Sequence, residues 1–253
     1  MIDVHCHILP GLDDGARDEA EALALARALV AEGVESVVCT PHIQPGVYAN
    51  TGPEIRRATR ELQLRLDARA IPLHLLAGAD NHVVPNFVCG LQSGTLLSLA
   101  DSRYVLVEPP HDVCPPRLAE LLFEVSTAGY VPVLTHPERL TWIGDHYGLM
   151  VRLVRRGVWM QVTAGSLAGH FSQTARYWSE RMLNEGLAHI LATDAHDTRR
   201  RCPLLSLGRK LAARIVGEDE ALHLVDTRPR GVISNTNSFD LPIPAAQRQQ
   251  LNR

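Results

Sequence analysis

The sequence lacks the features that mark membrane, secreted and nucleic-acid-binding proteins. Its 253 residues carry 25 Lys and Arg against 28 Asp and Glu, a net charge of −3, so no strong basic field attracts nucleic acid or anionic lipid. No stretch approaches the roughly 18 uncharged apolar residues that a membrane span needs, so we expect no membrane insertion. The first residues show neither the basic segment nor the apolar run of a signal peptide.

Cysteine is also scarce, and no linker divides the chain. The five Cys are an odd number without Cys-x-x-Cys spacing, which favours reduced thiols in a cytoplasmic protein over a disulfide framework. A content of 45% hydrophobic and 21% charged residues is typical of a globular protein. We expect one domain over residues 1–253, in which about residues 240–253 form a polar C-terminal tail that frays at Gln247–Arg253.

A weak internal repeat indicates alternating helices and strands. Four segments consist of a helical stretch, a glycine and a short apolar run that ends in threonine; the glycines are Gly33, Gly129, Gly157 and Gly186. Glycine suits the left-handed position after a helix, and the apolar run suits a strand covered on both faces. Repeated helix–strand units predict a parallel sheet.

The spacing of the predicted strands favours a barrel. Apolar periodicity predicts helices over residues 17–32, 117–128 and 147–156. Seven strands, including residues 2–7, 73–80 and 104–108, end near His7, His42, Asp80, Glu108, His136, Ala164 and Asp194. Regular spacing close to the roughly 30 residues of a βαβ unit favours an α/β barrel over an open doubly wound sheet.

Histidines and carboxylates follow the first strand. His5 and His7 are two residues apart, so their side chains point to the same face, as in many divalent-metal sites. The alternative is a pair of satisfied histidines in the barrel interior. Asp13 and Asp14, in the next loop, suit either a turn with a helix cap or metal ligation.

Five other strand ends carry similar side chains: His42; Asp80 and His82; Glu108 and His111; His136, Glu138 and Arg139; Asp194 and His196. Each could be a buried polar residue or a cap, but the carboxyl ends of barrel strands share one face. Several carboxylates and imidazoles in one cavity resist burial unless cations balance them. The pattern therefore predicts a multinuclear metal site, and ligands without cysteine suit Zn, Fe, Mn or Co.

These motifs resemble a known family. Met1–Ala16, Thr40-Pro41-His42, residues 135–139 and residues 193–196 are similar to the signatures of the PHP (polymerase and histidinol phosphatase) superfamily of metal-dependent phosphoesterases. More narrowly, the sequence from Met1 to about Asn235 resembles the bacterial PHP-type protein-tyrosine phosphatases of capsule and exopolysaccharide operons. The resemblance implies a distorted (βα)7 TIM-like barrel of the PHP type.

The resemblance also implies a three-metal centre. Its expected ligands are His5, His7 and Asp194 for the first metal, Glu108 and His136 for the second, Asp14, His42 and His196 for the third, and Asp80 as the bridge between the first two. Manganese is the first expectation, with Fe, Co or Zn as alternatives. The family usually has Glu in place of Asp80, and His82 could support or replace this shorter ligand. Arg139 and Arg201 are the implied phosphate-binding catalytic residues.

The implied activity is hydrolysis of a phosphate monoester in the cytoplasm. In the family mechanism, a hydroxide that bridges two metals attacks phosphorus while Arg139 and Arg201 hold the phosphoryl oxygens. The implied substrate is a tyrosine-phosphorylated polysaccharide-synthesis kinase, through its C-terminal tail, and no nucleic acid. Phosphatase chemistry that uses a Cys-x5-Arg loop is excluded because neither Cys114 nor Cys202 has that spacing to an arginine.

Other functions and roles remain open at this level. The same site could act on histidinol phosphate, another small phosphomonoester or a nucleic-acid 3′ end, or the protein could be a catalytically weak metal-binding accessory protein. Tyr48, Trp142 and Phe171 are expected in loops, where they either contact a substrate ring or pack within the loops. His111 could line the pocket, whereas structural roles are expected for His74, His146, His170, His189 and His223.

Overall fold

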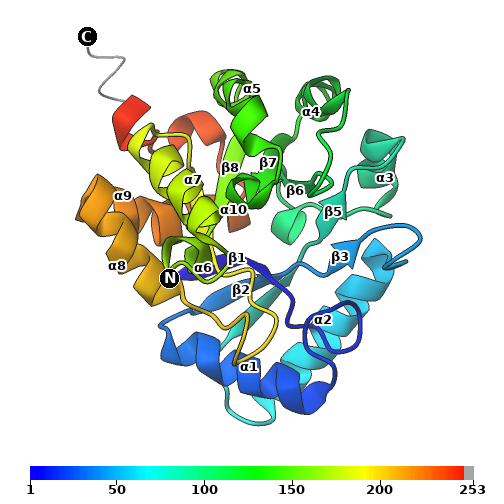
Figure 1. The fold of residues 1–253 in the computed structure, drawn as a ribbon. Helices are drawn as coiled ribbons and strands as arrows, with labels where there is room; N and C mark the ends of the chain where they lie inside the picture. Colours follow the sequence, from blue (N-terminus) through cyan, green and yellow to red (C-terminus); the bar gives the residue numbers. More distant parts are fainter. Residues whose placement is uncertain (248–253) are drawn as a thin grey trace.

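Parallel strands surrounded by helices form the fold, which a computed structural model describes over residues 1–247 (Figure 1). The strands are β1 (Ile2–Cys6), β2 (Ser36–Cys39), β3 (His42–Ile43), β4 (His74–Ala77), β5 (Asp80–His82), β6 (Tyr104–Glu108), β7 (Val131–Thr135), β8 (Trp159–Thr163) and β9 (Ile190–Ala192). The helices are α1 (Glu19–Ala31), α2 (Gly52–Asp67), α3 (Phe87–Ser93), α4 (Leu118–Thr127), α5 (Ile143–Arg155), α6 (Ala164–Leu167), α7 (Gln173–Asn184), α8 (Leu205–Val216), α9 (Glu218–Leu222) and α10 (Arg228–Ile233).

The strands form two parallel sheets that curl into a half-barrel. One sheet has the order β1-β2-β4 and the other has the order β3-β5-β6-β7-β8-β9. The outer strands β1 and β9 meet where the Asp194 amide donates to the His5 carbonyl at 2.8 Å and the His7 amide donates to the Ala195 carbonyl at 2.9 Å. These bonds bring the first and last strand ends together, so residues almost 190 positions apart share one site.

Two of the expected strands are interrupted. The prediction of one strand over residues 73–80 is wrong, because the chain leaves β4 at Ala77 and begins β5 in the other sheet at Asp80. The chain passes from β2 to β3 in the same way across Thr40 and Pro41. The two segments stay hydrogen-bonded across this point, because the Gly78 amide donates to the Cys39 carbonyl at 3.0 Å and the Asp80 amide donates to the Pro41 carbonyl at 3.2 Å. Gly78 lies close to Val38, where a side chain would overlap it.

The helix predictions are confirmed with small shifts at the ends. The three expected helices correspond to α1, α4 and α5, and α5 begins at Ile143, four residues before its predicted start. All four repeat glycines have the expected left-handed backbone, with φ between 70° and 93°. Helices α4, α5, α7 and α8 lie outside the strands in Figure 1, and apolar residues of both layers form the buried core between them.

The C-terminal segment up to Gln247 lies against the domain. The fully buried Arg228 pairs with Glu220 at 2.6 Å and donates to the Pro242 carbonyl at 2.7 Å. The Gln247 side chain donates to the Gly186 carbonyl at 2.6 Å. The first part of the expected tail is therefore docked, and the remainder, residues 248–253, lies outside the described residues.

His189 has the structural role expected for it and makes stability depend on pH. It stacks on Trp159 with ring centroids 5.1 Å apart, and the Met160 amide donates to its Nδ1 at 3.2 Å. Burial, helped by the charge of Arg228, lowers the pKa of His189 to about 3. The unfolded chain, with a histidine pKa of about 6.5, therefore binds more protons than the folded chain at intermediate pH.

We therefore expect stability to fall as the pH drops below about 6.5, with a contribution from His189 of about 1.4 kcal/mol between about pH 7.5 and 5.5. Urea unfolding at the two pH values measures this loss. In the His189→Gln variant, which keeps an acceptor but cannot titrate, the loss should shrink by about the same amount. An unchanged pH dependence in the variant would contradict the assignment.

Candidate metal centre

All nine residues expected as metal ligands lie together at the carboxyl ends of the strands. Eight of them are buried or nearly so, and Asp14, on the loop after β1, is the most exposed. They form overlapping groups whose nitrogen and oxygen atoms lie within 4.8 Å of one another. The strand order explains this convergence, because consecutive parallel strands end at the same edge of the half-barrel.

The first expected group converges on one point. The His5 Nε2 and His7 Nε2 atoms are 3.1 Å apart, and Asp194 Oδ1 lies 3.4 Å and 3.3 Å from them. His5 and His7 follow the alternation of β1, which turns both rings inward. Asp194 reaches them because of the contact between β1 and the segment after β9.

The other expected groups lie on either side of this point. Asp14 Oδ1 lies 3.6 Å from His42 Nε2 and 3.3 Å from His196 Nε2. Glu108 Oε1 lies 3.7 Å from His136 Nε2. Asp80 Oδ2 is 3.5 Å from His5 Nε2 and 4.0 Å from His136 Nε2, so this carboxylate lies between the first and the second group.

Two further histidines surround Glu108. His111 Nε2 is 3.5 Å from Glu108 Oε1, and together with His136 these residues form one of the candidate ligand groups. The sequence predicts for His111, whose side chain is 37% exposed, only a position lining the pocket. His82 Nδ1 lies 3.7 Å from Glu108 Oε2, so His82 lies next to Glu108, whereas the resemblance pairs it with the role of Asp80.

Several residues hold the candidate ligands in place. Asp13 Oδ2 accepts from His7 Nδ1 at 2.6 Å, and Gln161 Oε1 accepts from His5 Nδ1 at 2.9 Å, which leaves each Nε2 free to face the centre. Asp13 thus orients His7, a role that the sequence does not indicate, while its other oxygen closes the expected turn by accepting from the Gly15 amide at 2.9 Å. No sequence signal marks Gln161, because β8 ends without a titratable residue and its glutamine resembles any other strand residue.

The turn after β7 is fixed by a buried carboxylate that the sequence did not identify as important. Glu138 is 1% exposed, and its Oε1 accepts from the Thr163 amide at 3.0 Å and from Ser166 Oγ at 2.7 Å. Glu138 lies between His136 and Arg139 in the chain, so these bonds tie both to the end of β8. His136 itself has φ of +31° and Asp194 has φ of +51°, a backbone region that costs energy and is concentrated at functional sites.

The electrostatics of the cluster are those of a cation site. Burial and the nearby Glu108 carboxylate raise the pKa of Asp80 well above its usual value. Burial works against ionisation of Glu108 as well, but the imidazoles of His111, His42 and His82 outweigh it and hold the pKa of Glu108 well below its usual range. Burial lowers the pKa of His5 to about 3, so its ring is neutral and able to donate a lone pair to a metal.

Buried nitrogen and oxygen atoms that lack a hydrogen-bond partner indicate whether the site suits a metal ion. Six polar atoms of the expected ligands are buried without a hydrogen-bond partner: His42 Nδ1, both Asp80 oxygens, His136 Nδ1, Asp194 Oδ1 and His196 Nε2. Buried polar groups are normally satisfied, so a concentration of orphaned acceptors points to a missing class of partner. Imidazole and carboxylate donors fit divalent cations, and the described residues therefore suit a metal centre.

Two arginines face the same centre. Arg139 Nη1 pairs with Asp194 Oδ2, and Arg201 Nη2 lies 2.6 Å from the same oxygen. Arg201 Nη1 also lies 3.4 Å from Asp14 Oδ2. Both guanidiniums thus border the histidine and carboxylate cluster, where they can bind the oxygens of an anionic substrate.

The aromatic residues of the loops take separate positions. The Phe171 ring lies under Arg139, with the guanidinium carbon 4.2 Å from the ring centroid. Trp142 is buried and donates to the Pro110 carbonyl at 3.0 Å, which is loop packing. Tyr48 stacks on His42 with ring centroids 5.5 Å apart and planes 13° from parallel, at the border of the cluster.

Gly15 is required by the close approach of two loops. A Cβ at this position would overlap the His7 carbonyl and the His7 Cβ, and the Gly15 amide donates to Asp13 Oδ1 at 2.9 Å. Gly15→Ala must therefore push the loop away from β1 and displace Asp13 and Asp14.

For Gly15→Ala we expect a fall of at least about tenfold in metal affinity, the range seen when residues that orient ligands are lost. A calorimetric titration of metal into chelator-treated protein measures this change. Gly46→Ala is the matched control, since no atom lies within 4 Å of its added Cβ, although its positive φ also carries strain. Equal metal affinity of Gly15→Ala and the unmodified protein would contradict the role of this glycine.

The comparisons with known proteins agree with this geometry. Residues 1–234 match the family described as capsular polysaccharide synthesis, CpsB/CapC. The chain is 40% identical to the tyrosine-protein phosphatase YwqE of Bacillus subtilis, and 32% identical to the putative tyrosine-protein phosphatase CapC of Staphylococcus aureus; each match covers 79% of both chains.

A solved structure is similar along almost the whole fold. It comes from a study of YwqE from Bacillus subtilis and CpsB from Streptococcus pneumoniae, described as unique metal-dependent tyrosine phosphatases. The TM-score is 0.92 at 35% identity, over 96% of this chain and 98% of that one.

Across residues 1–247, no helix has both the length and the apolar character for a membrane crossing. All five cysteines are free, as expected.

Proposed function

Because the chain belongs to the CpsB/CapC capsular polysaccharide synthesis family, we propose that it is a metal-dependent protein-tyrosine phosphatase. The observation that carries this proposal is the convergence of nine buried or half-buried histidine and carboxylate side chains next to two arginines. The names of the similar proteins support the same activity. The reaction is hydrolysis of a phosphate monoester.

We propose that the centre holds three metal ions, with manganese as the first candidate. His5, His7 and Asp194 form the first site, Glu108 and His136 the second, and Asp14, His42 and His196 the third, with Asp80 as the bridge between the first two. The distances of 3.1–3.7 Å within these groups support a shared multinuclear centre. The division among three sites rests on the family resemblance, because His42 Nδ1 also lies 3.1 Å from Glu108 Oε2 in another group. His111 is an additional candidate for the second site, because its Nε2 faces Glu108.

Divalent cations at these sites supply Lewis acidity for the phosphoryl group and the means to activate water at neutral pH. The chain itself positions the substrate. Arg139 and Arg201 bind phosphoryl oxygens and balance the charge that develops on them. Phe171 supports Arg139 from below, and Glu138 fixes the turn from which Arg139 projects. The leaving group is a phenolate with a pKa of about 10, so its departure needs little help from an acid.

The fold and the substrate can be stated more finely as part of this proposal. We infer a single domain with a distorted (βα)7 barrel of the PHP type, since strands occupy all seven predicted positions, two of them as broken pairs. The inferred substrate is the tyrosine-phosphorylated C-terminal tail of a polysaccharide-synthesis kinase. The capsule-synthesis family and its tyrosine-phosphatase members support this choice. A cytoplasmic location follows from such a substrate.

Phosphate release from a phosphotyrosine peptide by chelator-treated protein tests the proposal. We expect no release without metal, and restored release when Mn, Co, Fe, Mg or Zn is added back singly, with Mn among the effective ions. Circular dichroism confirms that the treated protein is folded. If folded protein released no phosphate with any metal, the assignment as a tyrosine phosphatase would be wrong. Release that is unaffected by the chelator would remove the metal mechanism.

A further inference from the structure

An uncharged groove begins at the edge of the metal centre. It has a volume of about 950 Å³ and lies between the loop after β3, the loop after β5 and helix α3. These segments lie on the right of Figure 1. Its lining includes Tyr48, Val84, Cys89 and Leu96. Among its lining residues, all in the described part of the chain, there is no Asp, Glu, Lys or Arg. The volume is at the upper end of the roughly 300–1,000 Å³ of ligand sites.

The groove is continuous with the site. His82 and Gln44 line both the groove and a smaller hollow of about 310 Å³ that contains Glu108 and His111. Tyr48 forms the border, because its ring lines the groove and stacks on the candidate ligand His42. The loop that carries Tyr48 is closed by two backbone bonds with Gln44, at 2.8 Å and 2.9 Å. The path from the metal centre into the groove is therefore built from residues with fixed positions.

The uncharged residues that line the groove indicate what kind of chemical group binds there. A charged or strongly polar group would lose its hydration in the groove without gaining an ionic partner, whereas apolar side chains gain by leaving water. A phosphotyrosyl residue at the metal centre arrives within a polypeptide, and the tyrosine side chain separates the bound phosphate from the backbone. The residues that flank the phosphotyrosine therefore lie over the rim of the centre, where the groove offers an apolar surface.

We propose that this groove binds apolar side chains that flank the phosphotyrosine in the substrate polypeptide, and so determines which phosphotyrosines are hydrolysed. The proposal rests on the tyrosine phosphatase function inferred above. It assigns Val84 and Leu96 to substrate selection and gives the phosphatase a preference for an uncharged sequence around its target.

The preference can be measured with two phosphotyrosine peptides that differ only in their flanks, valine and leucine in one and glutamate in the other. Free phosphotyrosine is the third substrate, and it reports the reaction without the groove. We expect kcat/KM for the apolar peptide to exceed that for the acidic peptide by about tenfold, mainly through KM. Equal values for the two peptides would overturn the proposal. If none of the three substrates were hydrolysed, the proposed function itself would fail.

Val84→Glu tests the groove directly, because it places a carboxylate on a half-buried residue of the lining. The readout is the ratio of kcat/KM for the apolar peptide to kcat/KM for free phosphotyrosine. We expect this ratio to fall about tenfold. Leu207→Glu is the matched control and should keep the ratio, because Leu207 is exposed on α8 and does not line the groove. Helices α8 and α3 lie on opposite sides of Figure 1. Equal ratios for both variants would overturn the proposal.

A third test uses the unmodified protein, so its result does not depend on whether the variant folds. Cys89 is exposed and lines the groove, so its alkylation by a maleimide, located by mass spectrometry of the digested protein, reports occupancy. The apolar peptide should slow alkylation of Cys89 at least about fivefold more than the acidic peptide does. No difference between the peptides would contradict the proposal. Protection that rises with protein concentration alone would assign the groove to a second copy of the chain and overturn the proposal as well.

Discussion

Asp194→Ala is expected to reduce kcat for phosphotyrosine peptides by about a thousandfold or more. One oxygen of Asp194 faces His5 and His7, and the other receives Arg139 and Arg201. The alanine variant thus removes a candidate ligand and leaves two guanidiniums without their shared carboxylate. Asp194→Asn keeps the shape and tolerates the left-handed backbone at φ of +51°, but it loses the negative charge.

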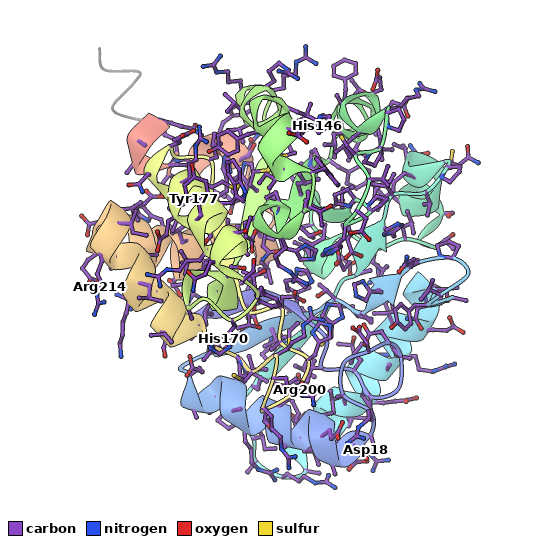
Figure 2. The ribbon with its side chains drawn as sticks, in the orientation of Figure 1. Asp18, His146, His170, Tyr177, Arg200 and Arg214 are labelled. Atoms are coloured by element: carbon purple, nitrogen blue, oxygen red, sulfur yellow. The ribbon has the colours of Figure 1, made fainter. Side chains whose placement is uncertain are left out.

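The comparison of these two variants separates charge from shape. If Asp194 acts as a ligand, both should lose activity and bound metal, while their circular dichroism spectra stay unchanged. His136→Ala should behave in the same way, since His136 Nε2 faces Glu108. His146→Ala is the matched control: His146 is exposed on α5, far from Arg200 in Figure 2, and should keep full activity. Retained activity in Asp194→Ala and His136→Ala would rule out the three-metal centre.

Arg139→Ala and Arg201→Ala should each lower kcat/KM for phosphotyrosine peptides by about a hundredfold, through both a higher KM and a lower kcat. Each guanidinium borders the metal cluster and offers a planar pair of donors that matches two phosphoryl oxygens. Arg139→Lys keeps the charge but not the fork, so we expect it to recover only part of the loss. Steady-state kinetics over a wide range of peptide concentration measure the two parameters separately.

The neighbouring Arg200 supplies the control for this experiment. Arg200→Ala removes the same charge one residue away, but Arg200 is exposed on the loop after β9, as Figure 2 shows. We expect its kinetics to match those of the unmodified protein, because an exposed arginine on this loop takes no part in phosphate binding. Should Arg201→Ala respond to substrate concentration as the unmodified protein does, Arg201 would have no part in phosphate binding.

The sequence determined the chemistry and the order of elements. Spacing and strand ends alone indicated a wider set of histidines and carboxylates that includes the residues that converge, because side chains at the carboxyl ends of consecutive parallel strands must share one edge. The family resemblance selected the nine expected ligands from that set. The glycines after the helices were equally readable, since few residues other than glycine adopt the left-handed backbone without strain. Resemblance, and not spacing, divided the ligands among three metals.

Only the tertiary structure decided which side chains support the ligands and how the site opens outward. Gln161 and Glu138 act through contacts with residues 25 to 156 positions away, and a lone polar residue carries no mark of such a partner. The break between β4 and β5 lies at Gly78 and Ala79, where the chain passes from one sheet to the other, and hydrophobic periodicity cannot register such a change of sheet. The uncharged groove is assembled from three segments, and its shape exists only once they are packed together. Local pattern thus specifies which groups are available, and the packing of distant segments specifies what surrounds them.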